Sequence, residues 1–165
     1  MMQLRPALPD DAAAIAAIYN HYILTTTVSF EELPVDAVDI AQRMAGVVAA
    51  GLPYLVAQEE DTVIGYAYAT AWRARPAYRH SVETSIYINA AAHGRGAGSA
   101  LYRLLLTELT ARGLHLAIGG ITQPNQASVA LHEKFGFEKV AHFRQVGRKF
   151  GRWIDVAYWE RKLGD

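Results

Sequence analysis

His93-Gly94-Arg95-Gly96-Ala97-Gly98 joins a predicted strand to a predicted helix, and this junction indicates the kind of fold the chain adopts. The segment before it, 82–88, is rich in β-branched and aromatic residues, as buried strands are. After it, apolar residues recur at helical spacing as far as Arg112, and Gly113 stands where that helix should end. A glycine-rich turn between a strand and a helix exposes backbone N–H groups at the positive end of the helix dipole. The stretch therefore predicts a phosphate-binding loop in an α/β fold.

Two common phosphate motifs fit this loop poorly. The Walker motif requires Lys and then Ser or Thr after its last glycine, whereas Ser99 and Ala100 follow Gly98. The dinucleotide fingerprint requires three glycines in a first βαβ unit, and from either Gly94 or Gly96 the third is missing. The spacing instead resembles the acetyl-CoA pyrophosphate loop of the GNAT acetyltransferase superfamily, with an ordinary tight turn as the alternative. The resemblance implies that the pyrophosphate of acetyl-CoA is held by Gly94, Arg95, Gly96, Ala97, Gly98 and Ser99.

A second segment, 125–137, resembles the other GNAT hallmark, in which an Asn, and a Ser three residues later, precede a helix that ends in Gly-Phe. A helix with Asn125 near its N-cap places Asn125, Ser128 and His132 on one side, and Gly136 ends it. An ordinary capped amphipathic helix explains the two ends but not this polar row. By resemblance, acetyl-CoA also contacts Asn125, Ser128 and the main chain of Ile86, Tyr87 and Ile88, which pairs with pantetheine like an added strand.

Composition limits the function classes. A chain of 165 residues with 52% hydrophobic and 19% charged residues predicts one compact domain over residues 1–165. The zero formal charge, without a Lys/Arg block, argues against a nucleic-acid surface. No apolar run is long enough to span a membrane and Met1–Arg5 does not begin a signal peptide, so we expect a cytoplasmic protein without a membrane partner. The absence of cysteine excludes disulfides, thiolate metal ligands and an acyl-cysteine intermediate, and we expect no metal.

The order of predicted elements supports the same fold. We predict strands at 4–7, 54–57, 63–69, 82–88, 114–118, 137–145 and 153–160, an extended segment at 25–30, and helices at 12–19, 35–50, 98–112 and from 125. The strands at 82–88 and 114–118 should be parallel, because a helix connects them. The resemblance covers the whole chain. It implies a GNAT α/β fold, a mixed, mostly antiparallel sheet of about seven strands flanked by about four helices, with a parallel pair splayed at the acetyl-CoA site.

The segment before the cofactor strand, 72–85, carries three arginines, an unusual cluster in a neutral protein. The planar fork of arginine binds carboxylates and other oxyanions, although Arg79 is equally explained as a solvated loop charge. Together with the segment 147–155, this stretch resembles the phosphinothricin and methionine sulfoximine N-acetyltransferases. That resemblance implies a homodimer and a small amino-acid analogue as acceptor, bound by Arg73, Ala74, Arg75, Glu83, Thr84 and Ser85.

Two residues are candidates for proton transfer. Glu83 shares one strand face with Ser85 and Tyr87, and a partly desolvated carboxylate can take a proton from an ammonium group, directly or through water. An exposed strand carboxylate without a catalytic role is the alternative. His132 occupies the position where many GNAT enzymes have a tyrosine that protonates the leaving thiolate, and packing against the core is its alternative role.

Other functions remain open at this point. The chain could acetylate a protein N-terminus or an aminoglycoside, although a polycationic aminoglycoside calls for a carboxylate-lined cleft rather than an arginine-rich one. A non-catalytic acetyl-CoA sensor would keep the glycine loop but would need neither Glu83 nor the arginines. The residues therefore favour an enzyme that transfers acetyl directly from acetyl-CoA to an amine.

Overall fold

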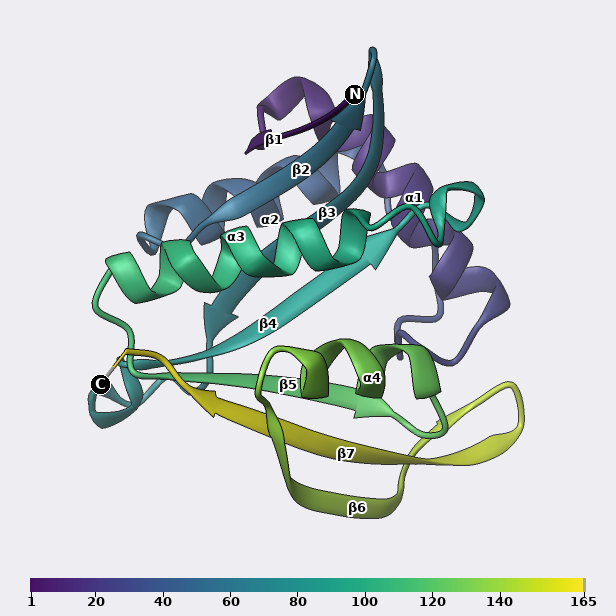
Figure 1. Ribbon diagram of the computed structural model, residues 1–165. Helices are drawn as coiled ribbons and strands as arrows, with labels where there is room; N and C mark the ends of the chain where they lie inside the picture. The colour runs from purple at the N-terminus through teal and green to yellow at the C-terminus, as the bar shows by residue number, and fades with distance from the viewer. Residues whose placement is uncertain (165) are drawn as a thin grey trace.

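The computed structural model describes residues 1–164 and contains a single sheet with helices on both faces (Figure 1). In this part of the chain the strands are β1 (Met2–Pro6), β2 (Tyr54–Glu59), β3 (Thr62–Ala71), β4 (Ser81–Ile88), β5 (Leu116–Thr122), β6 (Glu138–Lys149) and β7 (Arg152–Lys162). Their order is β1-β2-β3-β4-β5-β7-β6. The β4–β5 pair is parallel and the other described pairs are antiparallel, which confirms the predicted fold class.

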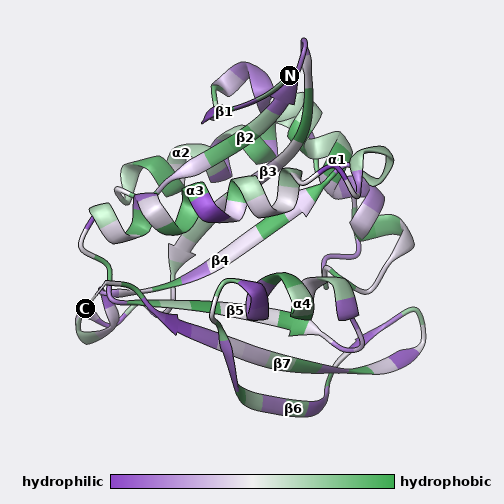
Figure 2. Ribbon diagram, viewed as in Figure 1, coloured by the Kyte–Doolittle hydropathy of each residue, from purple (hydrophilic) through white to green (hydrophobic). Residues whose placement is uncertain are grey.

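Two helices cover each face of the sheet. The helices α1 (Ala12–Thr25) and α2 (Ala37–Ala49) pack together on one face, and α3 (Ala97–Ala111) and α4 (Gln126–Lys134) lie on the other (Figure 1). Figure 2 shows hydrophobic residues along β2, β3 and the C-terminal half of β4, between the two helix layers. On α3, the fully buried Leu101, Leu105 and Leu109 follow each other at four-residue spacing. Burial of each contributes about 1.5–3 kcal/mol, so this row fixes α3 on the sheet.

The N-terminal connection differs from the prediction. The helix α1 continues to Thr25 rather than ending near residue 19, because Ile23 extends its buried face. The segment 25–30 is therefore not an extended strand but the end of α1 and the start of an irregular connection over residues 26–36. The side chain of Asn20 holds that connection by accepting from the Val35 N–H and donating to the Val35 carbonyl, both at 2.8 Å.

The C-terminal strands are also displaced from their predicted bounds. The strand predicted at 114–118 runs from Leu116 to Thr122, because residues 112–115 close the end of α3 around Gly113, whose φ is +76°. β6 and β7 are longer than predicted. They meet at Phe150 and Gly151, both with positive φ, and such a two-residue turn lets two strands pair up to its edge.

The parallel pair separates soon after it forms. The described pairing of β4 with β5 ends at Glu83 and Ile118, although the strands continue to Ile88 and Thr122. β4 keeps its pairing with β3 over the same length. Figure 1 shows β4 rising away from β5 toward the N-terminal end of α3. The sheet therefore contains an internal opening between two strands, as predicted for the acetyl-CoA site.

Candidate active site

Three cavities line the opening between β4 and β5, and they form one continuous cleft because Val28 and Tyr87 line all of them. A cavity of about 660 Å³ lies at one end, where its wall includes Glu31, Glu83 and Tyr158. A slot of about 60 Å³ follows between the strands. The third cavity, of about 290 Å³, reaches Ile88 and His93 beside the glycine loop. A ligand can therefore extend from the loop, past the opening, to the largest cavity.

The glycine loop has the backbone that its sequence predicts. Gly94 and Gly96 have φ of +80° and +83°, the left-handed region that other residues avoid. A Cβ at either position meets no described atom within 4 Å, so the loop surface is open. Gly96 is the N-cap of α3 and provides no side chain to cap it, and the buried Ala97 starts the helix. The first-turn N–H groups are thus left for an anion, which fits the pyrophosphate of acetyl-CoA.

The charged and polar side chains around the loop are already engaged. Arg95 forms an exposed ion pair with Glu59 at the end of β2, with 2.8 Å between Nη1 and Oε2. The hydroxyl of Ser99 accepts from Lys134 Nζ at 2.9 Å, so the end of α4 reaches the start of α3. His93 lies beside the cleft, where its Nε2 is 2.9 Å from the Tyr22 hydroxyl. Lys134 was not among the residues predicted for this site.

The main chain of residues 86–88 forms the free side of β4. Ile86 and Ile88 pair with Ala67 and Gly65 of β3, so the β3 side of the strand is occupied. On the other side β5 has already turned away. The Tyr22 hydroxyl donates to the carbonyl of Ile88, which marks where the free stretch ends. This geometry suits an extended chain added beside β4, as predicted for pantetheine.

The polar row on α4 is in the predicted place. Asn125 caps the helix, and its Oδ1 accepts from the Ser128 N–H at 3.1 Å. Asn125 and Ser128 line both the slot and the cavity beside the glycine loop. Gly136, with φ of +82°, follows the end of α4 as expected. The structure thus brings these residues to the same cleft as the loop.

Glu83 is half-buried in the largest cavity, on the same strand face as Ser85. Burial raises the pKa of its carboxyl group, and the nearby charge of Arg73 opposes part of that rise. The carboxylate passes over Gly120 of β5, where an added Cβ lies 3.5 Å from Glu83 Oε1 and 2.9 Å from Tyr158 Cε1. A glycine at this position leaves room for both side chains.

His132 is only 4% exposed. Its ring packs in the interior and also lines the slot. Its Nδ1 is 2.7 Å from the Ser128 carbonyl oxygen, so Nδ1–H donates and Nε2 is left as the acceptor of a neutral ring. Burial lowers the pKa of this imidazole, while the bond to the Ser128 carbonyl partly opposes the shift. The rings of Tyr102 and Phe137 pack edge-on against it, and Nε2 is 2.5 Å from a Cβ added at Gly119.

The predicted acceptor residues are divided between two places. Arg73 acts on Glu83 and Tyr158 through its charge, and its guanidinium lies 4.8 Å from the ring centre of Trp72. Arg73, Ala74 and Arg75 all line a cavity of about 380 Å³ near the ends of α2 and α3, and none of the three is among the residues that line the cleft. The Thr84 hydroxyl is buried against the Tyr102 hydroxyl at 2.6 Å, whereas Ser85 faces the largest cavity.

The sequence did not predict that residues from the segment 26–36 form part of the wall of the largest cavity of the cleft. Arg43 of α2 binds both carboxylate oxygens of Glu31, at 2.9 and 2.7 Å, and the Tyr19 hydroxyl donates to the same carboxylate. Lys149 of β6, only 2% exposed, donates to the Ser29 carbonyl at 2.7 Å. Lys149 lies in a segment that the resemblance quotes, but its 120-residue separation from Ser29 leaves no local pattern to predict the contact.

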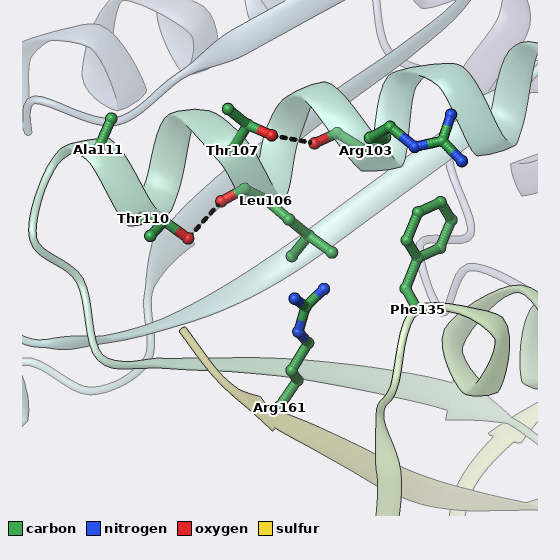
Figure 3. Close-up of a pocket in the computed structure, with 7 residues that line it drawn as sticks. All are labelled: Arg103, Leu106, Thr107, Thr110, Ala111, Phe135 and Arg161. Carbon is green, nitrogen blue, oxygen red and sulfur yellow. Dashed lines mark hydrogen bonds between the residues drawn. The ribbon is translucent and has the colours of Figure 1, made fainter. Parts of the chain in front are cut away.

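A further cavity of about 540 Å³ lies between α3 and β7 and shares no lining residue with the cleft (Figure 3). Its Thr107 and Thr110 hydroxyls donate to carbonyls one turn earlier in α3, those of Arg103 and Leu106. Within residues 1–164, no cluster of three metal-ligating side chains occurs. No helix in that range is long and apolar enough to cross a membrane.

Known proteins resemble the chain over nearly its whole length. A family model for the acetyltransferase (GNAT) domain matches residues 4–158. A phosphinothricin N-acetyltransferase of Streptomyces coelicolor is 42% identical over 98% of this chain and 96% of its own. An L-methionine sulfoximine/L-methionine sulfone acetyltransferase of Salmonella typhimurium is 37% identical over 99% and 96%.

A solved structure is also similar to this chain. The crystal structure of a phosphinothricin acetyltransferase from Sinorhizobium meliloti, in complex with acetyl-CoA, has a TM-score of 0.95, 40% sequence identity and coverage of 99% of this chain and 89% of that one. These matches confirm the predicted enzyme class and the predicted acetyl-CoA cofactor. The chain therefore belongs to the GNAT family of acetyltransferases.

Proposed function

We propose that this enzyme transfers the acetyl group of acetyl-CoA to the α-amine of a small amino-acid analogue, such as phosphinothricin, methionine sulfoximine or methionine sulfone. The observation that carries the proposal is the continuous cleft, which runs from the glycine loop through the β4–β5 opening to Glu83. The names of the relatives support the choice of this acceptor class.

Each part of the cleft has its own task. The N–H groups of residues 94–99 bind the pyrophosphate, and the free side of residues 86–88 orients the pantetheine arm. The thioester supplies an activated acetyl group once it lies in the slot. The chain contains no cysteine, so the acceptor amine itself attacks in a ternary complex.

Glu83 removes the proton that the acceptor ammonium must lose before attack. Its half-buried carboxylate has a raised pKa, which brings its proton affinity closer to that of the amine. Arg73, whose positive charge acts on Glu83, binds an anionic group of the acceptor. His132 lines the slot, where it takes part in proton transfer near the sulfur or keeps the slot packed.

We also propose that the enzyme acts as a homodimer in the cytoplasm. Support comes from the β6–β7 hairpin, where Phe143, Phe150 and Trp153 are each more than half exposed on an edge of the sheet. Trp159 of β7, in contrast, is 3% exposed and packs in the core, so it does not contribute to this exposed surface.

The proposal is tested by following thiol release from acetyl-CoA with a thiol reagent across a panel of acceptors. The panel contains phosphinothricin, methionine sulfoximine, methionine sulfone, an aminoglycoside and a peptide with an N-terminal alanine. We expect turnover with the first three and kcat/KM at least tenfold lower with the last two. Preference for the peptide or the aminoglycoside contradicts the acceptor class. Binding of acetyl-CoA without turnover of any acceptor would identify a sensor instead.

A further inference from the structure

Lys149 of β6 is a buried cation to which the proposed reaction gives no role. The residue is 2% exposed, and its Nζ donates to the Ser29 carbonyl oxygen at 2.7 Å. Within residues 1–164, no carboxylate forms an ion pair with this ammonium group. A lysine is rarely buried without a carboxylate, because its removal from water is costly unless hydrogen bonds replace the lost ones. The bond to Ser29 is therefore a specific attachment between two segments that lie 120 residues apart.

The segment that Lys149 contacts, residues 28–31, forms part of the wall of the largest cavity, and all four of its residues line that cavity. This wall segment belongs to neither a helix nor a strand. Within the part of the chain that the structure describes, no hydrogen bond between two backbone groups joins it to another element. Its position relative to the sheet therefore depends on side-chain contacts.

Those contacts come from the helices and from the sheet. On the helix side, the Tyr19 hydroxyl lies 2.8 Å from Ser29 Oγ, and Arg43 binds both carboxylate oxygens of Glu31. On the sheet side, Lys149 bonds to the Ser29 carbonyl. The wall segment is thus attached to α1 and α2 by one set of side chains and to the β6–β7 hairpin by another.

A second contact attaches the same hairpin to the wall segment. The ring of Phe30 occupies the space beside Gly147, where an added Cβ would lie 2.3 Å from Phe30 Cε2. Gly147 and Lys149 are two residues apart on β6, so they share one face of the strand. They contact successive residues of the wall segment, Phe30 and Ser29. β6 therefore determines where this part of the cavity wall lies.

The charges favour the same attachment. Burial lowers the pKa of the Lys149 ammonium group, and the negative charges of Glu32 and Glu31 oppose part of that shift. Glu31 is in the wall segment and Glu32 directly follows it. The ammonium group is therefore attracted to the same segment to which it donates its hydrogen bond.

We propose that Lys149 is a positioning residue of the acceptor site: it holds the wall segment against the β6–β7 hairpin and thereby sets the width of the cavity in which the acceptor binds. The inference rests on the proposed function, since it places the acceptor in this cavity. Lys149 lines none of the three cavities of the cleft, so it acts through Ser29 and does not touch the acceptor. Its loss should therefore change the acceptor KM more than kcat or the acetyl-CoA KM.

The kinetic test compares Lys149→Met, which keeps an apolar stem but lacks the ammonium group, with the unsubstituted chain. Steady-state rates give kcat and both KM values, with phosphinothricin and methionine sulfoximine as acceptors. Lys139→Met is the matched control, because Lys139 is an exposed lysine on the same strand. Lys149→Cys, alkylated with bromoethylamine while unfolded and then refolded, regains an ammonium group on a side chain of nearly the length of lysine. The chain contains no cysteine of its own, so this variant carries a single thiol.

Limited proteolysis reads the position of the wall segment without any substrate. A glutamate-specific protease should cleave after Glu31 and Glu32 more readily once the segment is released from the hairpin. Fragment masses identify these cleavages, and melting temperatures show whether each variant folds. Gly147→Ala displaces Phe30 while Lys149 is unchanged, so it tests the same wall segment if Lys149→Met does not fold.

We expect Lys149→Met to raise the acceptor KM roughly 5- to 10-fold, as for a lost hydrogen bond to a charged group, while kcat and the acetyl-CoA KM change by less than about twofold. Cleavage after Glu31 and Glu32 should become faster. Alkylated Lys149→Cys should recover most of the acceptor affinity, and Lys139→Met should behave as the unsubstituted chain does. Gly147→Ala should raise the acceptor KM selectively as well.

The inference is overturned if folded Lys149→Met keeps its acceptor KM, raises both KM values equally or is cleaved after Glu31 and Glu32 as slowly as the unsubstituted chain. It is also overturned if refolded, alkylated Lys149→Cys recovers no acceptor affinity, or if folded Gly147→Ala keeps its acceptor KM. These failures leave the proposed function intact, because the unsubstituted chain still acetylates the acceptor. An unsubstituted chain that turns over neither acceptor contradicts the proposed function itself, and proteolysis then decides alone whether Lys149 holds the wall segment.

Discussion

At the scale of single residues, Glu83 and Arg73 set the protonation behaviour of the cleft. Burial makes the ionised form of Glu83 less favourable, and the positive charge of Arg73 makes it more favourable. Burial dominates, so the pKa of Glu83 is above its ordinary value. A base must be deprotonated, so activity should decline on the acid side at a higher pH than an exposed glutamate gives.

Replacing Glu83 by Gln tests the base directly. We expect kcat to fall by roughly 10²–10⁴-fold while the fold and CoA binding are kept. The loss should become smaller as pH rises, because more of the acceptor amine is then unprotonated without help. Steady-state rates from pH 6 to 9 measure this, with Glu138→Gln, at an exposed strand end, as the control. An unchanged kcat at neutral pH means that another group is the base.

Replacing Arg73 by Ala removes the charge that opposes the raised pKa of Glu83. The acidic limb of the kcat/KM profile should therefore move to higher pH. The acceptor KM should also rise, with a loss of about 2–4 kcal/mol in transition-state binding, while the acetyl-CoA KM stays nearly constant. Arg75→Ala is the matched comparison, since of these two arginines only Arg73 acts on Glu83 through its charge, and we expect a smaller effect. Equal increases in both KM values for Arg73→Ala place that arginine at the CoA phosphates instead.

His132 should make stability depend on pH. Its pKa is lowered in the folded chain, so above the ordinary imidazole pKa both states are neutral and the protein has its full stability. As pH falls from there toward the lowered value, only the unfolded state gains the proton, and stability decreases. The melting temperature should therefore fall between pH 8 and pH 5, and less steeply in His132→Phe. A similar slope in both proteins refutes this assignment. A drop of kcat in His132→Phe at neutral pH indicates proton transfer; an unchanged kcat indicates packing alone.

At the scale of elements, β5 is shaped by two adjacent glycines that serve opposite faces of the sheet. Gly119 admits the His132 ring from α4, and Gly120 admits Glu83 and Tyr158 on the other side. Successive residues of a strand point to opposite faces, so this pair makes room for both candidate proton-transfer groups at once. β5 therefore has no side chains at the two positions that directly follow the end of its pairing with β4.

An alanine at each glycine should separate stability from activity. In Gly119→Ala the new methyl group meets the buried His132 ring at 2.5 Å, which should cost roughly 1–3 kcal/mol of stability. In Gly120→Ala it meets Tyr158 and Glu83 in an open cavity, so kcat should fall and the melting temperature should change less. Thermal melts and rate measurements on both variants test this. The prediction fails if Gly120→Ala keeps full activity.

At the scale of the whole molecule, the hairpin of β6 and β7 leaves an apolar edge on the sheet. Phe143, Val146, Phe150 and Trp153 are 52–58% exposed there, and β6 has no strand on its outer side within the described chain. The same hairpin holds residues 26–36 through Lys149 and through Phe30, whose ring occupies the space beside Gly147. Contacts made at this edge therefore influence the wall of the acceptor cavity.

We expect light scattering at micromolar concentration to give twice the mass of one chain. Trp153→Glu should shift the mass toward that of a single chain, because a charge would be buried in the contact. The acceptor KM should then rise more than the acetyl-CoA KM, since the hairpin supports the acceptor wall. Arg144→Glu, another charge change on β6, is the control for surface charge alone. A single-chain mass for the unsubstituted protein refutes the dimer.

The sequence by itself determined the features that depend on local backbone and local spacing. The glycines at 94 and 96 predicted the loop, because positive φ is a property of single residues, and both have it. Gly136 predicted the C-terminal end of α4 for the same reason, and Asn125 predicted its N-terminal end because its side chain caps the first turn. Strand alternation placed Glu83 beside Ser85, and the helix connection predicted that β4 and β5 are parallel.

The tertiary structure alone decided which distant side chains meet. Arg73, Ala74 and Arg75 line a cavity apart from the one that contains Glu83, and of the two arginines only Arg73 acts on Glu83 through its charge. Lys149 binds Ser29, and Lys134 contacts Ser99 at the start of α3, whereas Arg95 of the loop pairs with Glu59 of β2. Such contacts arise from the packing of elements far apart in the chain, whose separation leaves no period or spacing in the sequence. The loop and the strand faces were therefore predictable, whereas the charge distribution around the cleft was not.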